Sequence, residues 1–173
     1  MNHDSYPQDY IAGILTGVNS IAVVGASGND VRPSWFVVKY LIGKGFKVFP
    51  VNPGMAGSEV LGRPVHARLA DIGEPVDMVD IFRGSDAAPG VVEEALRLSP
   101  PPKVIWMQLG VRNDEAAKRA EDAGLQVVMN RCPKIEYGRL SGEIGWTGVN
   151  SGVLSSKRPL LKAGFQHFGI RQR

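Results

Sequence analysis

The sequence contains a single cysteine, Cys132, and three histidines that lie far apart, so two common ways of stabilising a small fold are excluded. One cysteine cannot form an internal disulfide. The cysteine and the histidines also lack the close spacing that zinc sites require. We therefore expect neither an intramolecular disulfide nor a bound metal.

Long hydrophobic runs are absent as well. No stretch approaches the ~20 consecutive apolar residues that a membrane-spanning helix needs. Residues 1–10 lack the basic-then-apolar pattern of a secretory signal. The 173 residues are 43% hydrophobic and 21% charged, a balance that excludes a disordered chain and suffices for one globular domain. We expect a cytoplasmic protein with no membrane partner.

The excess of positive charge, +3 over the whole chain, is confined to the C-terminal segment. Against Glu143 alone, residues 141–173 carry Lys157, Arg158, Lys162, Arg171 and Arg173. The nearly neutral remainder lacks the cations with which a nucleic-acid-binding domain contacts phosphates, so nucleic acid is not an expected partner. We predict a domain over 1–140 and a basic, glycine-containing tail over 141–173. This tail is available to a protein partner or to a second copy in a homo-oligomer.

Apolar segments of strand length alternate with amphipathic segments of helix length, a pattern typical of βαβ units. The predicted strands are 20–24, 47–51, 76–82, 103–109 and 125–129. The predicted helices are 6–17, 33–43, 86–98 and 113–123, with a short extended piece at 60–65 and a brief helix at 69–72. The fold class that follows is α/β: a Rossmann-like, open, mainly parallel five-stranded sheet with helices on both faces, in a single domain.

The strongest local signal is a loop of small residues after the first strand. Ile21–Val24 leads into Gly25, Ala26, Ser27 and Gly28, shortly before a predicted helix. Glycines let a ligand approach the backbone closely, and the N–H groups at the start of a helix attract phosphate. A tight turn without a ligand explains the same residues, so the loop alone leaves both interpretations open.

The usual dinucleotide-binding pattern is incomplete in this chain. It combines three glycines with an acidic residue at the end of the second strand, which binds the ribose. Here the second strand ends in Val51, Asn52 and Pro53, which supply no carboxylate. The sequence therefore favours another adenine nucleotide, and an NAD(P)-binding oxidoreductase or redox sensor is the alternative.

Five segments, in this order, resemble those of the small stand-alone CoA-binding proteins, whose domain is similar to the CoA-binding domain of the succinyl-CoA synthetase alpha subunit. They are Val23-Val24-Gly25-Ala26-Ser27, Val51-Asn52-Pro53, Val79-Asp80-Ile81-Phe82-Arg83, Trp106-Met107-Gln108-Leu109-Gly110-Val111 and Val128-Met129-Asn130-Arg131-Cys132-Pro133-Lys134-Ile135-Glu136-Tyr137. The resemblance spans about 20–140. It implies a Rossmann-like sheet whose cofactor is coenzyme A or an acyl-CoA.

The resemblance also implies roles for individual positions. The diphosphate would be held by Gly25, Ala26 and Ser27, together with Gly28 in the same loop. The nucleotide would be lined by Val51, Asn52 and Pro53, with Phe82 and Arg83 facing the same crevice. Relatives commonly carry a cation directly after the Asn-Pro pair, where this chain has Gly54. Arg32, Lys39 or Arg63 would then have to supply that charge.

Two later segments complete the implied site. The turn from Gln108 to Gly110 follows a strand, so it belongs at the carboxyl edge of the sheet. There it would meet the pantetheine arm; the alternative is a plain turn without a ligand.

Cys132 lies at the end of the last strand, in a segment that resembles the Asn-Cys-Pro stretch of the synthetases. A mixed disulfide with CoA would need a thiolate stabilised by Arg131 or Lys134. The alternative is a small residue packed at the end of a strand.

The sequence shows no recognisable catalytic set. Asp77 and Asp80 share a strand at odd spacing, which points them to opposite faces, and there is no Gly-x-Ser-x-Gly motif. The synthetases that the chain resembles use a phosphorylated histidine in a second domain, whereas His167 lies in the tail without a glycine-rich context. We predict a non-catalytic CoA-binding, sensor or accessory protein, and the further alternative is an accessory subunit of a multi-chain acyl-CoA ligase.

Overall fold

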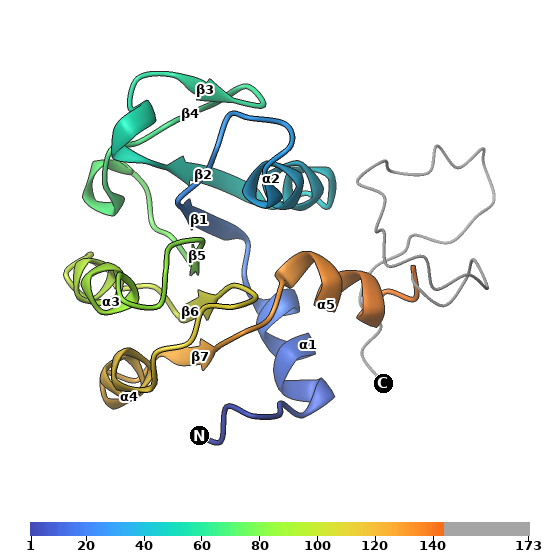
Figure 1. Ribbon diagram of the computed structural model, residues 1–173. Coiled ribbons are helices and arrows are strands. Elements are labelled where there is room, and N and C mark those ends of the chain that lie inside the picture. The colour runs from blue at the N-terminus through green and yellow to red at the C-terminus, as the bar shows by residue number, and fades with distance from the viewer. Residues whose placement is uncertain (144–173) are drawn as a thin grey trace.

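A computed structural model describes residues 1–143, which form a five-stranded sheet with helices on both faces (Figure 1). Its main elements are α1 (Gln8–Gly17), β1 (Ser20–Val24), α2 (Pro33–Gly43), β2 (Lys47–Val51), β5 (Met78–Ile81), α3 (Ala88–Leu96), β6 (Val104–Met107), α4 (Asp114–Asp122), β7 (Gln126–Val128) and α5 (Pro133–Leu140). Between β2 and β5 come the 3-10 turns η1 (Pro53–Met55) and η2 (Leu69–Asp71) and the short strands β3 (Glu59–Val60) and β4 (Arg63–Pro64). The predicted α/β, Rossmann-like fold class is confirmed.

The order of strands in the sheet is β2-β1-β5-β6-β7, and all four pairings are parallel. After β1 the chain moves outward to β2, then crosses back to place β5 on the other side of β1. The direction of winding therefore reverses between β1 and β5. In open α/β sheets, ligands bind outside the carboxyl ends of the strands at such a reversal.

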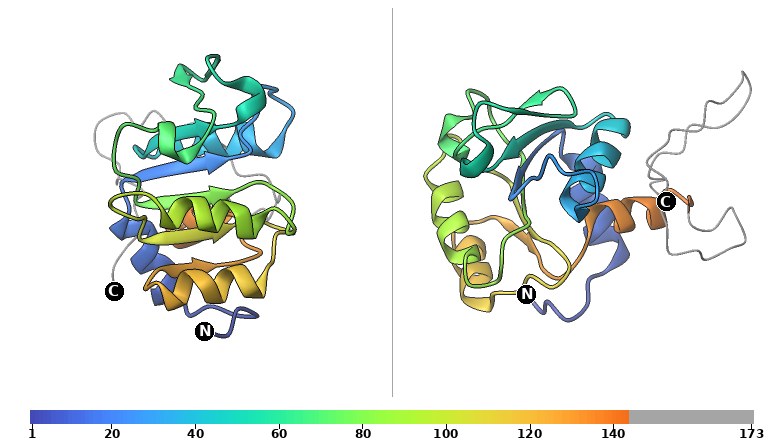
Figure 2. Two further views of the ribbon diagram at one scale, coloured as in Figure 1. Left: turned by 90° about the vertical axis from the view of Figure 1, so that its left-hand side faces the viewer. Right: turned by 45° about the horizontal axis from the view of Figure 1, so that its top comes forward.

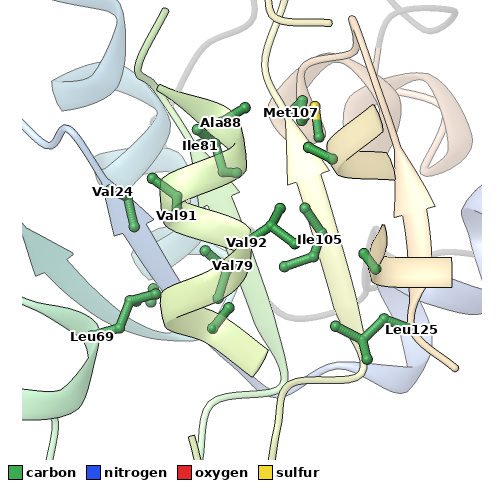
Figure 3. Close-up of a cluster of buried hydrophobic side chains, with 14 of the residues drawn as sticks. Val24, Leu69, Val79, Ile81, Ala88, Val91, Val92, Ile105, Met107 and Leu125 are labelled. Atoms are coloured by element: carbon green, nitrogen blue, oxygen red, sulfur yellow. The ribbon is translucent and has the colours of Figure 1, made fainter. Parts of the chain in front are cut away.

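The helices divide into two layers that cover opposite faces of the sheet. Figure 1 shows α3 and α4 on one face and α1, α2 and α5 on the other. The left view of Figure 2 shows α3 and α4 side by side in front of the strands. In Figure 3, Val91 and Val92 of α3 lie against Val79, Ile81 and Ile105 of the sheet. Each strand supplies both faces because successive side chains alternate.

One helix was not predicted. The last element predicted from the sequence is the fifth strand, yet Pro133 begins a further helix, α5, which packs against α1 and α2. Proline suits the first position of a helix because its missing N–H would be unpaired there.

Most of the predicted tail lies outside the described residues. Among residues 1–143, no helix is both long enough and apolar enough to cross a membrane.

Candidate functional site: a crevice at the carboxyl edge of the sheet

Gly25 joins the carboxyl ends of three strands. Its N–H donates to the carbonyl of Val51 (2.8 Å), and the N–H of Phe82 donates to the carbonyl of Val24 (2.8 Å). Gly25 has a φ of +93°, and a Cβ added there would lie 2.9 Å from the Phe82 carbonyl oxygen. Only glycine fits this position. The fold itself therefore requires Gly25, whatever ligand the loop holds.

Asn52 fixes the position of the loop after β1. Its Nδ2 donates to the carbonyl of Ala26 (2.8 Å), and its Oδ1 accepts from the N–H of Gly54 (3.0 Å). The neighbouring Val51 is buried and Pro53 is exposed. The resemblance implied that these three residues line the nucleotide. The contacts of Asn52 show in addition a structural role, because its amide is engaged by the protein on both sides.

The loop leaves backbone donors free. The Ser27 hydroxyl accepts from the N–H of Asn29 (3.1 Å), but the N–H groups of Ala26, Ser27 and Gly28 donate to no acceptor within residues 1–143. The following helix, α2, has Arg32 at its N-cap, and no side chain caps it. The free N–H groups of the loop can donate hydrogen bonds to an anion, and the uncapped start of α2, a few residues further along the chain, attracts negative charge through the helix dipole.

Two arginines whose backbone lies near this loop have no acidic partner among the described residues. Arg32 precedes α2 directly, and Arg83 follows Phe82, whose carbonyl faces Gly25. Neither forms an ion pair with any described residue. Of the other cations suggested from the sequence, Lys39 lies over the Trp35 ring (4.6 Å). Arg63 also lacks an ion pair with the described residues, and it lies on β4.

A pocket of about 540 Å³ opens between the starts of α2 and α5. Its lining residues are Val31, Pro33, Phe36, Val37, Phe82, Gln108, Leu109, Val111, Cys132, Lys134 and Ile135. It therefore brings together three residues that the sequence assigned to the site: Phe82, Gln108 and Cys132. Gly110 is not among the lining residues, and its N–H donates to Asn130 Oδ1 (2.8 Å). The pocket adjoins the loop through Phe82.

A buried acid that was not among the predicted site residues holds one of the lining residues of this pocket. Asp80 is fully buried, and its Oδ2 accepts from Gln108 Nε2 (3.1 Å), while its Oδ1 has no partner among the described residues. Burial raises the pKa of this carboxyl to about 8, although the Gln108 hydrogen bond lowers it. The sequence signal was an acid in the middle of an apolar strand.

Cys132 lies at the N-cap of α5 and is only 7% exposed. Burial raises the pKa of its thiol, and hydrogen bonds from the backbone of Ile135 and Lys134 offset only part of this effect. Burial also lowers the pKa of Lys134, whose Nζ lies over the ring of Phe36 (5.8 Å). A protonated thiol is a poor nucleophile, which argues against the suggested mixed disulfide.

Three comparisons relate this chain to known proteins. Residues 19–138 match the sequence model of a family described as a CoA binding domain. The chain is 38% identical over 127 residues to YneT, an uncharacterized protein of Bacillus subtilis strain 168, a match that covers 73% of this chain and 91% of YneT. A hypothetical protein from Pyrococcus horikoshii OT3 has a similar structure, with a TM-score of 0.74 and 38% identity over 81% of this chain and 96% of that one.

A larger protein contains a related region. An acetyl-coenzyme A synthetase from Candidatus Korarchaeum cryptofilum is 25% identical and superposes with a TM-score of 0.52. The match covers 65% of this chain but only 26% of the synthetase. The likeness therefore concerns one part of that enzyme.

Proposed function

Because the chain belongs to the CoA-binding domain family, we propose that it binds coenzyme A or an acyl-CoA in the crevice between β1 and β5. The observation that carries this proposal is the loop with free N–H groups at Ala26, Ser27 and Gly28, which ends at the uncapped start of α2. These donors suit the diphosphate, and Arg32 and Arg83 would add charge-assisted bonds. The adenosine would lie towards the end of β2.

The pantetheine arm would run from the loop past Phe82 towards Gln108. This path follows the edge of the sheet from β1 to β6, and it ends in the pocket that Cys132 also lines. The N–H of Gly110 is already bound to Asn130, so the side chain of Gln108 is the better partner for a pantetheine amide. CoA supplies a thiol for carrying acyl groups, and in this proposal the chain binds and orients it.

We further propose a binding or sensor role without catalysis. The thiol in the pocket, Cys132, has a raised pKa because it is buried, so it lacks the thiolate that a nucleophile needs. His3 contacts Tyr6 and Glu121, and His66 contacts Phe49; neither histidine lines the pocket. His167 lies outside the described residues. Lys134 also lines the pocket, and in this proposal its amine contacts the ligand and does not activate the buried thiol.

Calorimetric titration of the purified chain with CoA, NAD and NADP tests the proposed ligand. We expect CoA to bind with the highest affinity, because the end of β2 offers no carboxylate for an NAD ribose. Arg32→Ala and Arg83→Ala should each weaken CoA binding about tenfold, the scale of a lost hydrogen bond to a charged group. Both should also reduce the dependence of affinity on salt.

Arg97→Ala is the matched control. Arg97 is exposed at the C-cap of α3, away from the crevice, and like Arg32 it forms no ion pair with a described residue. Its removal should leave the affinity for CoA unchanged. The proposal is wrong if CoA does not bind at millimolar concentration, if NAD binds as tightly, or if all three arginine variants behave alike.

A further inference from the structure

The uncovered apolar surface of the described residues gathers at one place. The large hydrophobic side chains that remain exposed among residues 1–143 are Met1, Val31, Phe36, Leu61, Leu109 and Ile135. Four of these six line the pocket. Single exposed apolar residues are normal on a soluble protein, whereas a contiguous group marks a binding surface.

This apolar rim is built from three segments that are distant in the sequence. Val31 and Phe36 come from the start of α2, Leu109 from the turn after β6, and Ile135 from α5. The convergence depends on the parallel sheet, which brings the carboxyl ends of β1, β6 and β7 to one edge. The rim therefore surrounds the place where the proposed pantetheine arm ends.

The interior of the pocket is also mainly apolar. Val37, Phe82 and Val111 form deeper walls, and the polar lining is limited to Gln108, Cys132 and Lys134. A volume of about 540 Å³ is many times the ~30 Å³ that one water occupies in the liquid. The pantetheine arm would fill the part of the pocket between Phe82 and Gln108, and a bare thiol at its end would leave the rim in contact with water. A larger apolar group fits this lining better.

Resting on the proposed CoA binding, we propose that the pocket holds an uncharged, apolar acyl group carried on the CoA thiol. The protein is then selective for aliphatic or aromatic acyl-CoA thioesters over free CoA. The amide of Gln108, which Asp80 holds in place, has both a donor and an acceptor, so it can bond to the thioester carbonyl as well as to a pantetheine amide. A terminal carboxylate on the acyl group would be disfavoured, because it would lose its hydration among apolar walls. Lys134 is the one cation among the lining residues, and its Nζ already lies over the rings of Phe36 and Tyr40.

A series of ligands tests this selectivity by calorimetry: CoA, acetyl-CoA, butyryl-CoA, hexanoyl-CoA and succinyl-CoA. Burying one methylene group strengthens binding up to about fourfold, so butyryl-CoA should bind about tenfold more tightly than acetyl-CoA. Hexanoyl-CoA should gain further until the pocket is full. Succinyl-CoA has the same chain length as butyryl-CoA, yet it should bind about tenfold or more weakly than butyryl-CoA.

Leu109→Ser and Leu61→Ser form a matched pair of variants. Both leucines are exposed, at 55% and 39%, but only Leu109 lines the pocket. Leu109→Ser should reduce the preference for butyryl-CoA over CoA several-fold. Leu61→Ser should leave both this preference and the affinity for CoA unchanged.

Each other outcome has a definite meaning. Equal affinity for CoA and for every acyl-CoA would overturn the acyl pocket and leave the proposed CoA binding intact, whereas no binding of any of the five ligands would overturn both. Succinyl-CoA binding as tightly as butyryl-CoA would refute the apolar specificity. If Leu109→Ser instead changes the sedimentation coefficient and leaves the ligand series unaltered, the rim is an interface between copies and the inference is wrong.

Discussion

The two faces of the sheet use alternate residues of the same strands. The face under α3 and α4 is filled by apolar side chains, whereas the proposed binding pocket opens on the side of α2 and α5. Towards α3 and α4, the strands present Val79, Ile81, Ile105 and Met107, which pack in an apolar cluster (Figure 3). On the opposite face of β5 lies Asp80, which is paired in register with Val23 and Trp106. A single step along the strand thus leads from an apolar core to a buried acid that holds Gln108, a lining residue of the pocket.

Buried polar residues follow the same division. In the described part of the chain they are Ser20, Ser34, Asp80, Gln108, Glu136 and Ser141. All but Ser20 belong to the face of α2 and α5 or to these helices and their ends; Ser20 instead bonds to Pro75 and Asp77 at the start of β1. Burying polar groups costs free energy unless they find partners. Both faces carry a buried apolar cluster that supplies stability, and the face of α2 and α5 gives up part of this stability to bury polar groups beside the proposed binding site.

The face under α3 and α4 should show the largest effect of a single substitution. Ile105→Ala removes a fully buried side chain from the centre of the apolar cluster and should lower the free energy of unfolding by about 2–5 kcal/mol. Urea denaturation measures this loss. The CoA affinity of the folded variant should equal that of the wild type, because Ile105 points away from the pocket. A loss below about 1 kcal/mol, or a changed affinity, would contradict the division between the faces.

The face of α2 and α5 should show a dependence of stability on pH. The pKa of Asp80 is about 8 in the folded protein and ~3.9 in an unfolded chain, so between these values only the folded state keeps the proton. The stabilisation is complete below pH ~4, and it is lost as pH rises towards 8, by up to about 1.4 kcal/mol per pH unit.

Asp80→Asn isolates this contribution, because asparagine does not ionise and still accepts from Gln108. We expect the free energy of unfolding of the variant to lack this decline, so that the difference between variant and wild type grows from pH 5 to pH 8. Denaturation in urea at pH 5, 7 and 9 measures it. The other titratable groups cancel in the difference. Parallel pH profiles for the two proteins would refute a raised pKa at Asp80.

Local patterns in the sequence predicted most of the fold. Continuous apolar runs such as 20–24 indicate buried parallel strands, and the alternation of strands and helices indicates the sheet. The loop from Gly25 to Gly28 was also found, because small residues after a strand are a local signal. Helix α5 was missed, since its sequence shows little apolar periodicity beyond Pro133.

Contacts between distant segments could not be predicted in this way. The clamp from Asn52 to Ala26 joins β2 to the loop after β1, and nothing near Asn52 in the sequence indicates it. The burial of Asp80 depends on Val23 and Trp106, its neighbours in the sheet. The apolar rim likewise needs three segments brought together. Parallel strands do predict which loops share an edge, and for this reason the assigned residues gathered near one crevice.

The smallest effect concerns the reactivity of Cys132 on the face of α2 and α5. Burial raises the pKa of its thiol, so the folded protein at pH 7 should hold less thiolate than a free cysteine does. Its reaction with a disulfide reagent such as DTNB should be several-fold slower in the folded protein than in the same chain unfolded in urea. With CoA and the oxidant diamide, mass spectrometry should then find the CoA adduct only after unfolding. The opposite result would be rapid, complete formation of the adduct on the folded protein, reversed by reductant and absent in Cys132→Ser. It would show that bound CoA meets a reactive thiol. The pocket would then be a redox site as well as a binding site.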